Sequence, residues 1–244
     1  MINILSSNAH SASRAFTKVQ RKANESNIQW LERNMPPGDN QSILVMVGGK
    51  TQTSFRLRIA QSHVRHDLLP SYWSHVMLLG KAAKNLGSTK VYEISLESPQ
   101  GFGYPTPNNG VQEGRLARYD DVSEYPNVAV IAVPVTLKEI LSALDRFKMQ
   151  RAILDAVDLM VRWLAFAWGV SRSGNPLLDG AGIPSAAMLE IAIGAAGFDL
   201  TPGLESRSSC PEAIWQAAKW WHEYYEGQNK QGLSGSYFTP HKLE

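Results

Sequence analysis

The sequence predicts an α+β protein in which an antiparallel sheet is packed against helices. Apolar residues recur mainly at every second position between residues 38 and 134, which is typical of strands. Between residues 136 and 226 they recur at a period of about 3.6, which is typical of helices. Because the strand-like segments between residues 38 and 134 are followed by the helical ones between 136 and 226, the order favours α+β over an alternating α/β arrangement.

A chain of 244 residues with 43% hydrophobic residues can bury a core of its own. We therefore expect residues 1–244 to form a single domain with three consecutive parts. These are an N-terminal helix over 11–34, a β-rich block over 38–134, and a helical block over 136–226 that carries the candidate nucleophile.

The N-terminal helix is predicted from apolar residues at roughly helical spacing, from Ala15 and Phe16 to Leu31. Its basic side is expected to be a solvated face rather than a docking surface. The run Pro36-Pro37-Gly38-Asp39 ends the helix.

The β-rich block contains six segments with strand-like apolar patterns. The strongest is 127–133, and the apolar run 43–47 suits a central strand. Residues 55–59 alternate as Phe55-Arg56-Leu57-Arg58-Ile59, which indicates a strand with one buried face. The other predicted strands are 73–79, 90–96 and 114–119. Several prolines and glycines make 98–110 a long loop.

The helical block begins at Thr136, which with Glu139 three residues later forms a capping box. Helices are predicted over 137–149, 150–169, 184–197 and 210–226.

Charge and composition exclude several classes of protein. A net charge of +2 is too small to favour nucleic acid or an anionic membrane surface. Charged residues interrupt the apolar stretches 152–170 and 183–198, so no transmembrane segment is expected. The first residues lack the pattern of a secretory signal, and a lone cysteine fits a reducing compartment, so we expect a cytoplasmic protein.

The only cysteine, Cys210, lies at the predicted start of a helix, after Ser208-Ser209 and before Pro211-Glu212. It cannot form an internal disulfide, so its role must lie in packing or in the reactivity of its thiol. Since the positive end of a helix dipole favours a thiolate, the position suggests a reactive thiol.

A thiol nucleophile needs an imidazole base and a third polar group that orients the imidazole. His75 lies within an apolar predicted strand, where a polar residue needs a reason, and Glu93 lies on the next strand. Each residue also has an alternative interpretation when it is considered alone. His75 could be a core histidine that is hydrogen-bonded to a backbone carbonyl, and Glu93 could occupy an exposed position of a strand. A metal site at His63, His66 and Asp67 is disfavoured because no second ligand motif accompanies it. Gly48-Gly49-Lys50-Thr51 lacks the earlier glycine of a phosphate loop, so no cofactor is expected.

Four short motifs, taken in their order along the chain, resemble those of a known family. They are Ser74-His75-Val76-Met77-Leu78-Leu79-Gly80, Val91-Tyr92-Glu93-Ile94, Asn127 to Val133, and Ser209-Cys210-Pro211-Glu212-Ala213-Ile214-Trp215. The chain resembles the permuted papain-like enzymes of the NlpC/P60 superfamily, specifically the YiiX/YaeF-type amidases, in which histidine precedes cysteine. The resemblance implies a cysteine hydrolase (amidase or peptidase) with Cys210 as nucleophile, His75 as general base and Glu93 as the group that orients His75. It also implies a small amide, a peptide or an acyl lipid as substrate.

Aromatic residues near the candidate site suggest how a substrate is held. Tyr72 and Trp73 directly precede His75, and Phe102 and Tyr104 lie in the predicted long loop, so all four are candidate substrate-binding residues. The alternative is a non-enzymatic protein-binding module or an inactive relative, in which Cys210 is a buried hydrophobe. In that case the aromatic 210–226 helix contacts a protein partner, although packing inside the protein is the favoured role of its aromatic residues.

Overall fold

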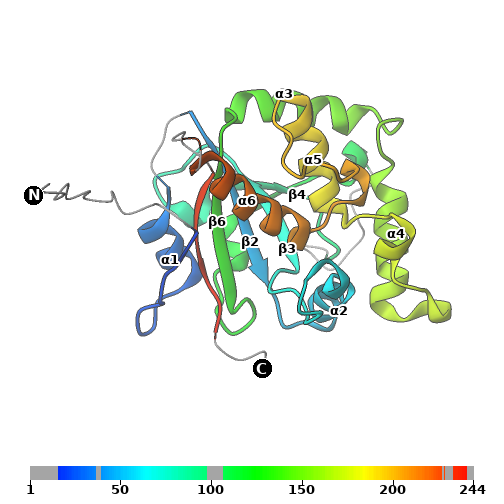
Figure 1. Ribbon diagram of the computed structural model, residues 1–244, viewed down its shortest axis with the longest axis horizontal. Helices are drawn as coiled ribbons and strands as arrows, with labels where there is room; N and C mark the ends of the chain where they lie inside the picture. Colours follow the sequence, from blue (N-terminus) through cyan, green and yellow to red (C-terminus); the bar gives the residue numbers. More distant parts are fainter. Residues whose placement is uncertain (1–15, 37–39, 98–106, 227, 229–232, 241–244) are drawn as a thin grey trace, which may run out of the picture.

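The computed structural model describes residues 16–36, 40–97, 107–226, 228 and 233–240. The described residues form a mixed α+β fold around a seven-stranded, mostly antiparallel sheet with the strand order β1-β7-β6-β2-β3-β4-β5. Helices α5 and α6 cross in front of this sheet in Figure 1, with α1 near one end and α4 at the other. The predicted α+β class is confirmed at this level.

The strands are β1 (Thr17–Lys18), β2 (Ser42–Gly48), β3 (His75–Leu79), β4 (Lys90–Glu93), β5 (Gln112–Arg115), β6 (Asn127–Val133) and β7 (Ser234–Phe238). The α-helices are α1 (Asn27–Asn34), α2 (Gln52–Ala60), α3 (Leu137–Met149), α4 (Ala156–Trp168), α5 (Pro184–Ala195) and α6 (Pro211–Glu226).

The sheet separates two hydrophobic cores. On β3, Val76 and Leu78 belong to the larger core, which also contains side chains of α2 to α6. Met77 and Leu79 belong to the second core, together with Trp30 of α1. Because successive side chains of a strand point to opposite faces, this alternation defines a helical face with α2 to α6 and an α1 face.

The structure confirms the strongest predicted elements. The apolar runs at 43–47 and 127–133 are β2 and β6, which pair antiparallel over seven positions in the centre of the sheet. Helix α3 has the expected capping box, since Thr136 accepts from the backbone N–H of Glu139 and the Glu139 side chain bonds back. Each of these segments has a local signal that agrees with its tertiary environment.

The prediction of a strand over 55–59 is wrong, because these residues lie in α2. Thr51 caps this helix and accepts a hydrogen bond from the backbone N–H of Ser54. Leu57 is buried, whereas Phe55 and Ile59 are 49% and 43% exposed. The alternating pattern therefore came from apolar residues on the solvent side of a helix, which periodicity cannot distinguish from a strand over five residues.

The predicted N-terminal helix is also wrong over much of its length. Thr17–Lys18 forms the edge strand β1, which pairs parallel with β7. The helix begins only at Asn27, after Ser26 and Gln29 form a capping box. Strand β7 was not predicted, because its sequence Ser-Gly-Ser-Tyr-Phe has little apolar periodicity. Residues 11–15 of the expected helix lie outside the described residues.

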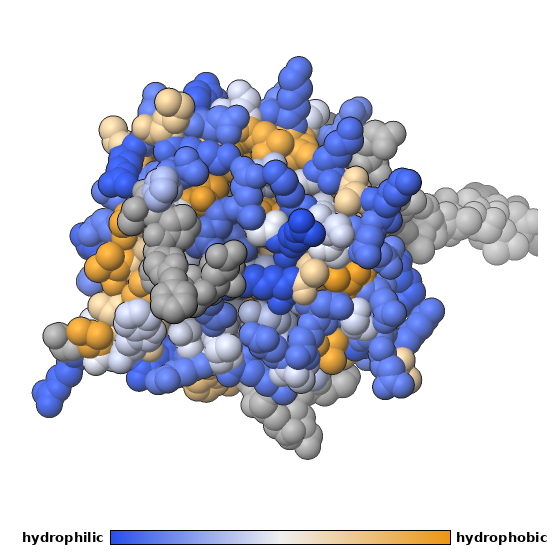
Figure 2. All heavy atoms as spheres, turned by 180° about the vertical axis from the view of Figure 1, so that it is seen from behind, coloured by the Kyte–Doolittle hydropathy of each residue, from blue (hydrophilic) through white to orange (hydrophobic). Residues whose placement is uncertain are grey.

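Two observations concern the surface. Within the described residues, no helix combines the length and apolar character needed to cross a membrane. Seen from behind, the molecule shows polar side chains over most of its surface, with apolar residues in separate patches (Figure 2).

Candidate functional site

His75 and Glu93 form a directly bonded pair on the α1 face of the sheet. His75 opens β3, and its Nε2 lies 2.6 Å from Oε2 of Glu93, the last residue of β4. The register Leu78↔Tyr92, extended by one residue, places Glu93 opposite Met77. Glu93 is therefore the diagonal neighbour of His75 on the same face of the sheet, within side-chain reach. The structure brings these two sequence-predicted residues together.

Two further side chains hold Glu93 as an anion. The Tyr119 hydroxyl donates to the same Oε2 at 2.5 Å, and Arg118 Nη1 lies 3.6 Å from Oε1. Burial alone would raise the pKa of the fully buried Glu93. The hydrogen bond and charge of His75, then Tyr119 and Arg118, outweigh burial and lower that pKa. Neither Arg118 nor Tyr119 was predicted, because only the fold brings the 116–119 turn next to β4.

The charge state of Glu93 fixes the tautomer of His75. An ionised carboxylate only accepts hydrogen bonds, so Nε2 of His75 carries the proton and donates it. In the neutral form of the ring, Nδ1 then presents a lone pair, and the described residues provide no hydrogen bond to it. This is the form of an imidazole that accepts a proton from a substrate or nucleophile.

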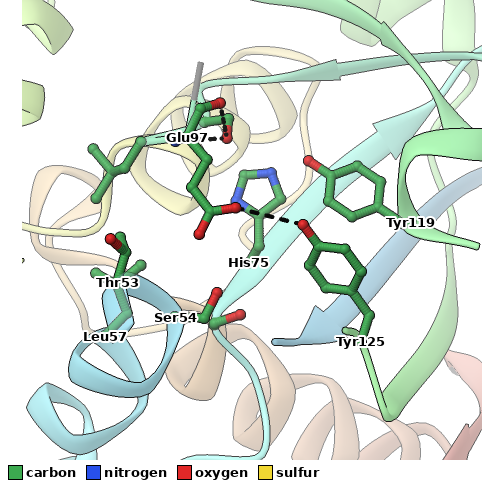
Figure 3. A pocket seen from close by; sticks show the side chains of 10 residues that line it. Thr53, Ser54, Leu57, His75, Glu97, Tyr119 and Tyr125 are labelled. Atoms are coloured by element: carbon green, nitrogen blue, oxygen red, sulfur yellow. Dashed lines mark hydrogen bonds between the residues drawn. The ribbon is translucent and has the colours of Figure 1, made fainter. Parts of the chain in front are cut away.

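His75 opens onto a small pocket beside the first turn of α2. In Figure 3 its ring lies in the middle of the pocket, with Thr53 and Ser54 on one side and Tyr119 and Tyr125 on the other. The cavity measures about 20 Å³, which is room for a water-sized group. The lining residues are mostly hydroxyl-bearing: Thr53, Ser54, Leu57, Ser74, His75, Ser95, Leu96, Glu97, Tyr119 and Tyr125.

Ser54 presents a hydroxyl to this pocket from the first turn of α2. Its backbone N–H donates to Thr51 Oγ1, but its side-chain oxygen has no hydrogen-bond partner in the described part of the chain. A Cβ at Gly49 would lie 2.6 Å from Ser54 Oγ, so glycine at this position leaves space for the hydroxyl. The N–H groups of Gln52 and Thr53 open the helix and have no acceptor within it. Ser54 was missed because its segment was interpreted as a strand. The signal that would have found it is Thr51 as an N-cap, three residues earlier.

Cys210 lies in the other core, away from His75. The thiol directly precedes α6 and is 1% exposed, among the apolar side chains of the helical face. His75 shares the α1 face with Met77 and Leu79, because it has the same parity along β3. The sheet therefore lies between the sulfur and the imidazole, and the expected contact between them is absent from the structure.

The expectation of an easily ionised thiol is corrected as well. Burial raises the pKa of Cys210 to about 12, and the nearby Glu212 carboxylate adds to this rise. The backbone N–H groups of Ala213 and Glu212 act in the opposite direction but do not compensate. The helix start does favour a thiolate, as the sequence suggested, but removal from water is the larger effect.

Of the predicted substrate-binding residues, the two described ones, Tyr72 and Trp73, do not line the pocket. Trp73 is fully buried in the core of the helical face, and its ring packs against that of Trp215 at 5.0 Å. Tyr72 packs on the same core and lies under the Arg65 guanidinium. Phe102 and Tyr104 lie outside the described residues.

The aromatic residues of α6 divide between the core and the surface. Trp215 is 4% exposed, whereas Trp220 and Tyr224 are 48% and 46% exposed and stack on each other. The favoured interpretation, packing inside the protein, therefore holds at Trp215 and does not hold at Trp220 and Tyr224.

Comparison with known proteins adds no assignment, since no family model, curated protein or solved structure matches the chain. In the described part of the chain, no three His, Cys, Asp or Glu side chains come close enough to hold a metal ion.

Proposed function

We propose that the protein is a hydrolase of the acyl-transfer type, in which His75 is the general base and Ser54 supplies the nucleophilic hydroxyl. The observation that carries the proposal is the buried 2.6 Å bond between His75 and Glu93, with the other ring nitrogen open to a pocket. A hydroxyl, an imidazole and an orienting carboxylate are the three parts that nucleophilic catalysis by serine requires.

The reaction follows from this arrangement. Ser54 Oγ forms a bond to the acyl carbon of an ester or amide while its proton passes to Nδ1 of His75. The carbon–leaving-group bond then breaks, and His75 gives that proton to the departing oxygen or nitrogen. Water repeats the sequence on the acyl-serine, again losing a proton to His75, and the acid is released with Ser54 restored. Glu93 stabilises the imidazolium in both halves.

The start of α2 is suited to stabilise the oxyanion of these steps. The N–H groups of Gln52 and Thr53 are free of intrahelical acceptors, and the first turn carries the positive end of the helix dipole. Donors of this kind, aimed at the position where negative charge develops, stabilise the transition state of acyl transfer.

The permuted papain-like architecture and its cysteine chemistry form a rival proposal. The order of β3, β4, β6 and α6 and the His75–Glu93 pair support it. The buried position of Cys210 on the opposite face opposes a cysteine nucleophile, because the sulfur would first have to reach the imidazole.

Hydrolysis of p-nitrophenyl acetate by purified variants separates the two nucleophiles. We expect Ser54→Ala to reduce kcat/KM to the level of the His75→Ala protein, because the residues act as one unit. Cys210→Ala is the matched control and is expected to keep activity within about threefold, since the thiol takes no part. If Cys210→Ala were inactive and Ser54→Ala active, the serine assignment would be contradicted and the cysteine hydrolase supported.

A further inference from the structure

Glu97 contributes a carboxylate to the pocket of His75 and Ser54. Its Oε1 accepts a 2.6 Å hydrogen bond from Thr51 Oγ1, which holds the side chain at the start of α2. Within the described residues, its Oε2 has only a long contact, 3.5 Å, from the Tyr125 hydroxyl. Figure 3 shows this carboxylate between Tyr125 and the side chains of α2, directed into the cavity.

No cation of the described residues forms an ion pair with this carboxylate. Arg118 is the nearest candidate, but its Nη1 faces Glu93 and its Nη2 donates to the backbone carbonyl of Glu97. Burial, followed by the charge of Glu97, raises the pKa of Tyr125, so that residue remains a neutral hydroxyl. Among the described residues that line the pocket, Glu97 is therefore the only carboxylate, and no guanidinium or ammonium group accompanies it.

The charge of this carboxylate matters for the proposed chemistry. An oxyanion that forms at the first turn of α2 lies near the Glu97 carboxylate, which Thr51 holds at the start of that helix, and is repelled by it. A positively charged group on the substrate, bound to Glu97 Oε2, would remove that repulsion and add a charge-assisted hydrogen bond.

We propose that the pocket selects substrates with a protonated amine next to the scissile acyl carbon, which is the chemistry of α-aminoacyl esters and amides. An ammonium group is about the size of the water that a 20 Å³ cavity holds. It offers three donors, and Oε2 of Glu97 and the oxygen of Tyr125 are acceptors for two of them. The expected effect of Glu97 on the rate of hydrolysis rests on the proposed function. Its expected effect on the binding of an amine does not.

The binding arm uses a ligand that cannot be hydrolysed. In calorimetric titrations of the full chain, alaninol is expected to bind at least tenfold more tightly than N-acetylalaninol, which has no charge. Glu97→Gln, which keeps an acceptor for Thr51, is expected to abolish that difference. Asp121→Asn removes a carboxylate that does not line the pocket, and this control variant should keep the difference in affinity between the two ligands. Equal binding of the two ligands to the unaltered protein would overturn the inference.

The kinetic arm compares L-alanine methyl ester with N-acetyl-L-alanine methyl ester by acid release. The unaltered protein is expected to prefer the ester with the free amine by at least tenfold in kcat/KM. The Glu97→Gln protein is expected to reverse this preference, because it hydrolyses the acetylated ester faster. Turnover of both esters at equal rates would overturn the selection while leaving the hydrolase intact. Amine-selective binding without turnover of either ester would instead contradict the hydrolase and retain Glu97 as a cation site.

Discussion

Replacing His75 by alanine is expected to lower kcat/KM for ester hydrolysis by about 100- to 10,000-fold, the usual contribution of a positioned general base. The loss arises because no other described group in the pocket combines a free lone pair with an orienting carboxylate. Glu93→Gln should lose most of the same activity, since an amide can hold the ring in the wrong tautomer and cannot stabilise the imidazolium.

Two controls make this prediction specific. His66→Ala removes an exposed histidine outside the pocket and should leave kcat/KM unchanged within about twofold. Tyr119→Phe removes one of the hydrogen bonds to Glu93 but keeps the ring, and should lower kcat/KM by less than about tenfold. Equal activity of the His75→Ala and His66→Ala proteins would remove His75 from the mechanism.

Replacing Glu212 by alanine is expected to lower the free energy of unfolding by about 3–5 kcal/mol. Glu212 is fully buried in the first turn of α6, where it accepts a 2.6 Å hydrogen bond from Ser71 and lies 3.6 Å from Arg65. Gln216 donates to its other oxygen at 2.5 Å. Alanine would leave these donors unsatisfied, and the buried guanidinium would keep its two hydrogen bonds to Asp67 but lose the Glu212 carboxylate.

Urea unfolding measures this effect, provided that the m-value stays constant. Glu212→Gln keeps the shape and an acceptor, so it should cost less than the alanine variant. Glu205→Ala removes an exposed carboxylate just before α6 and should stay within about 0.5 kcal/mol of the unaltered protein. A Glu212→Ala protein as stable as the Glu205→Ala protein would show that this buried network does not anchor α6.

The sequence predicted the central strands and the helices α3, α5 and α6, because each combines a clear period with boundary residues that agree with it. It failed at 55–59, where five residues are too few to separate the two periods, and at β7, whose small polar residues depend on pairing with β6. In both places the tertiary environment decides the structure.

Only part of the candidate site could be predicted from the sequence. His75 and Glu93 could be paired because neighbouring antiparallel strands carry them on the same face. The position of Cys210 could not be predicted, because a helix sequence does not say which face of a sheet it will cover. Ser54 and Glu97 reach the pocket from separate segments, Arg118 approaches Glu93 from a third, and only the folded chain gathers them.

The most direct test of the account is the site at which a fluorophosphonate modifies the native protein, because such a reagent marks a serine activated by a base. After trypsin digestion, we expect the adduct in peptide 51–56, between Lys50 and Arg56, with fragmentation placing it on Ser54 and no adduct in the His75→Ala protein. An unmodified 51–56 peptide, or an adduct unaffected by the loss of His75, would contradict the assignment of this pocket as the reaction centre.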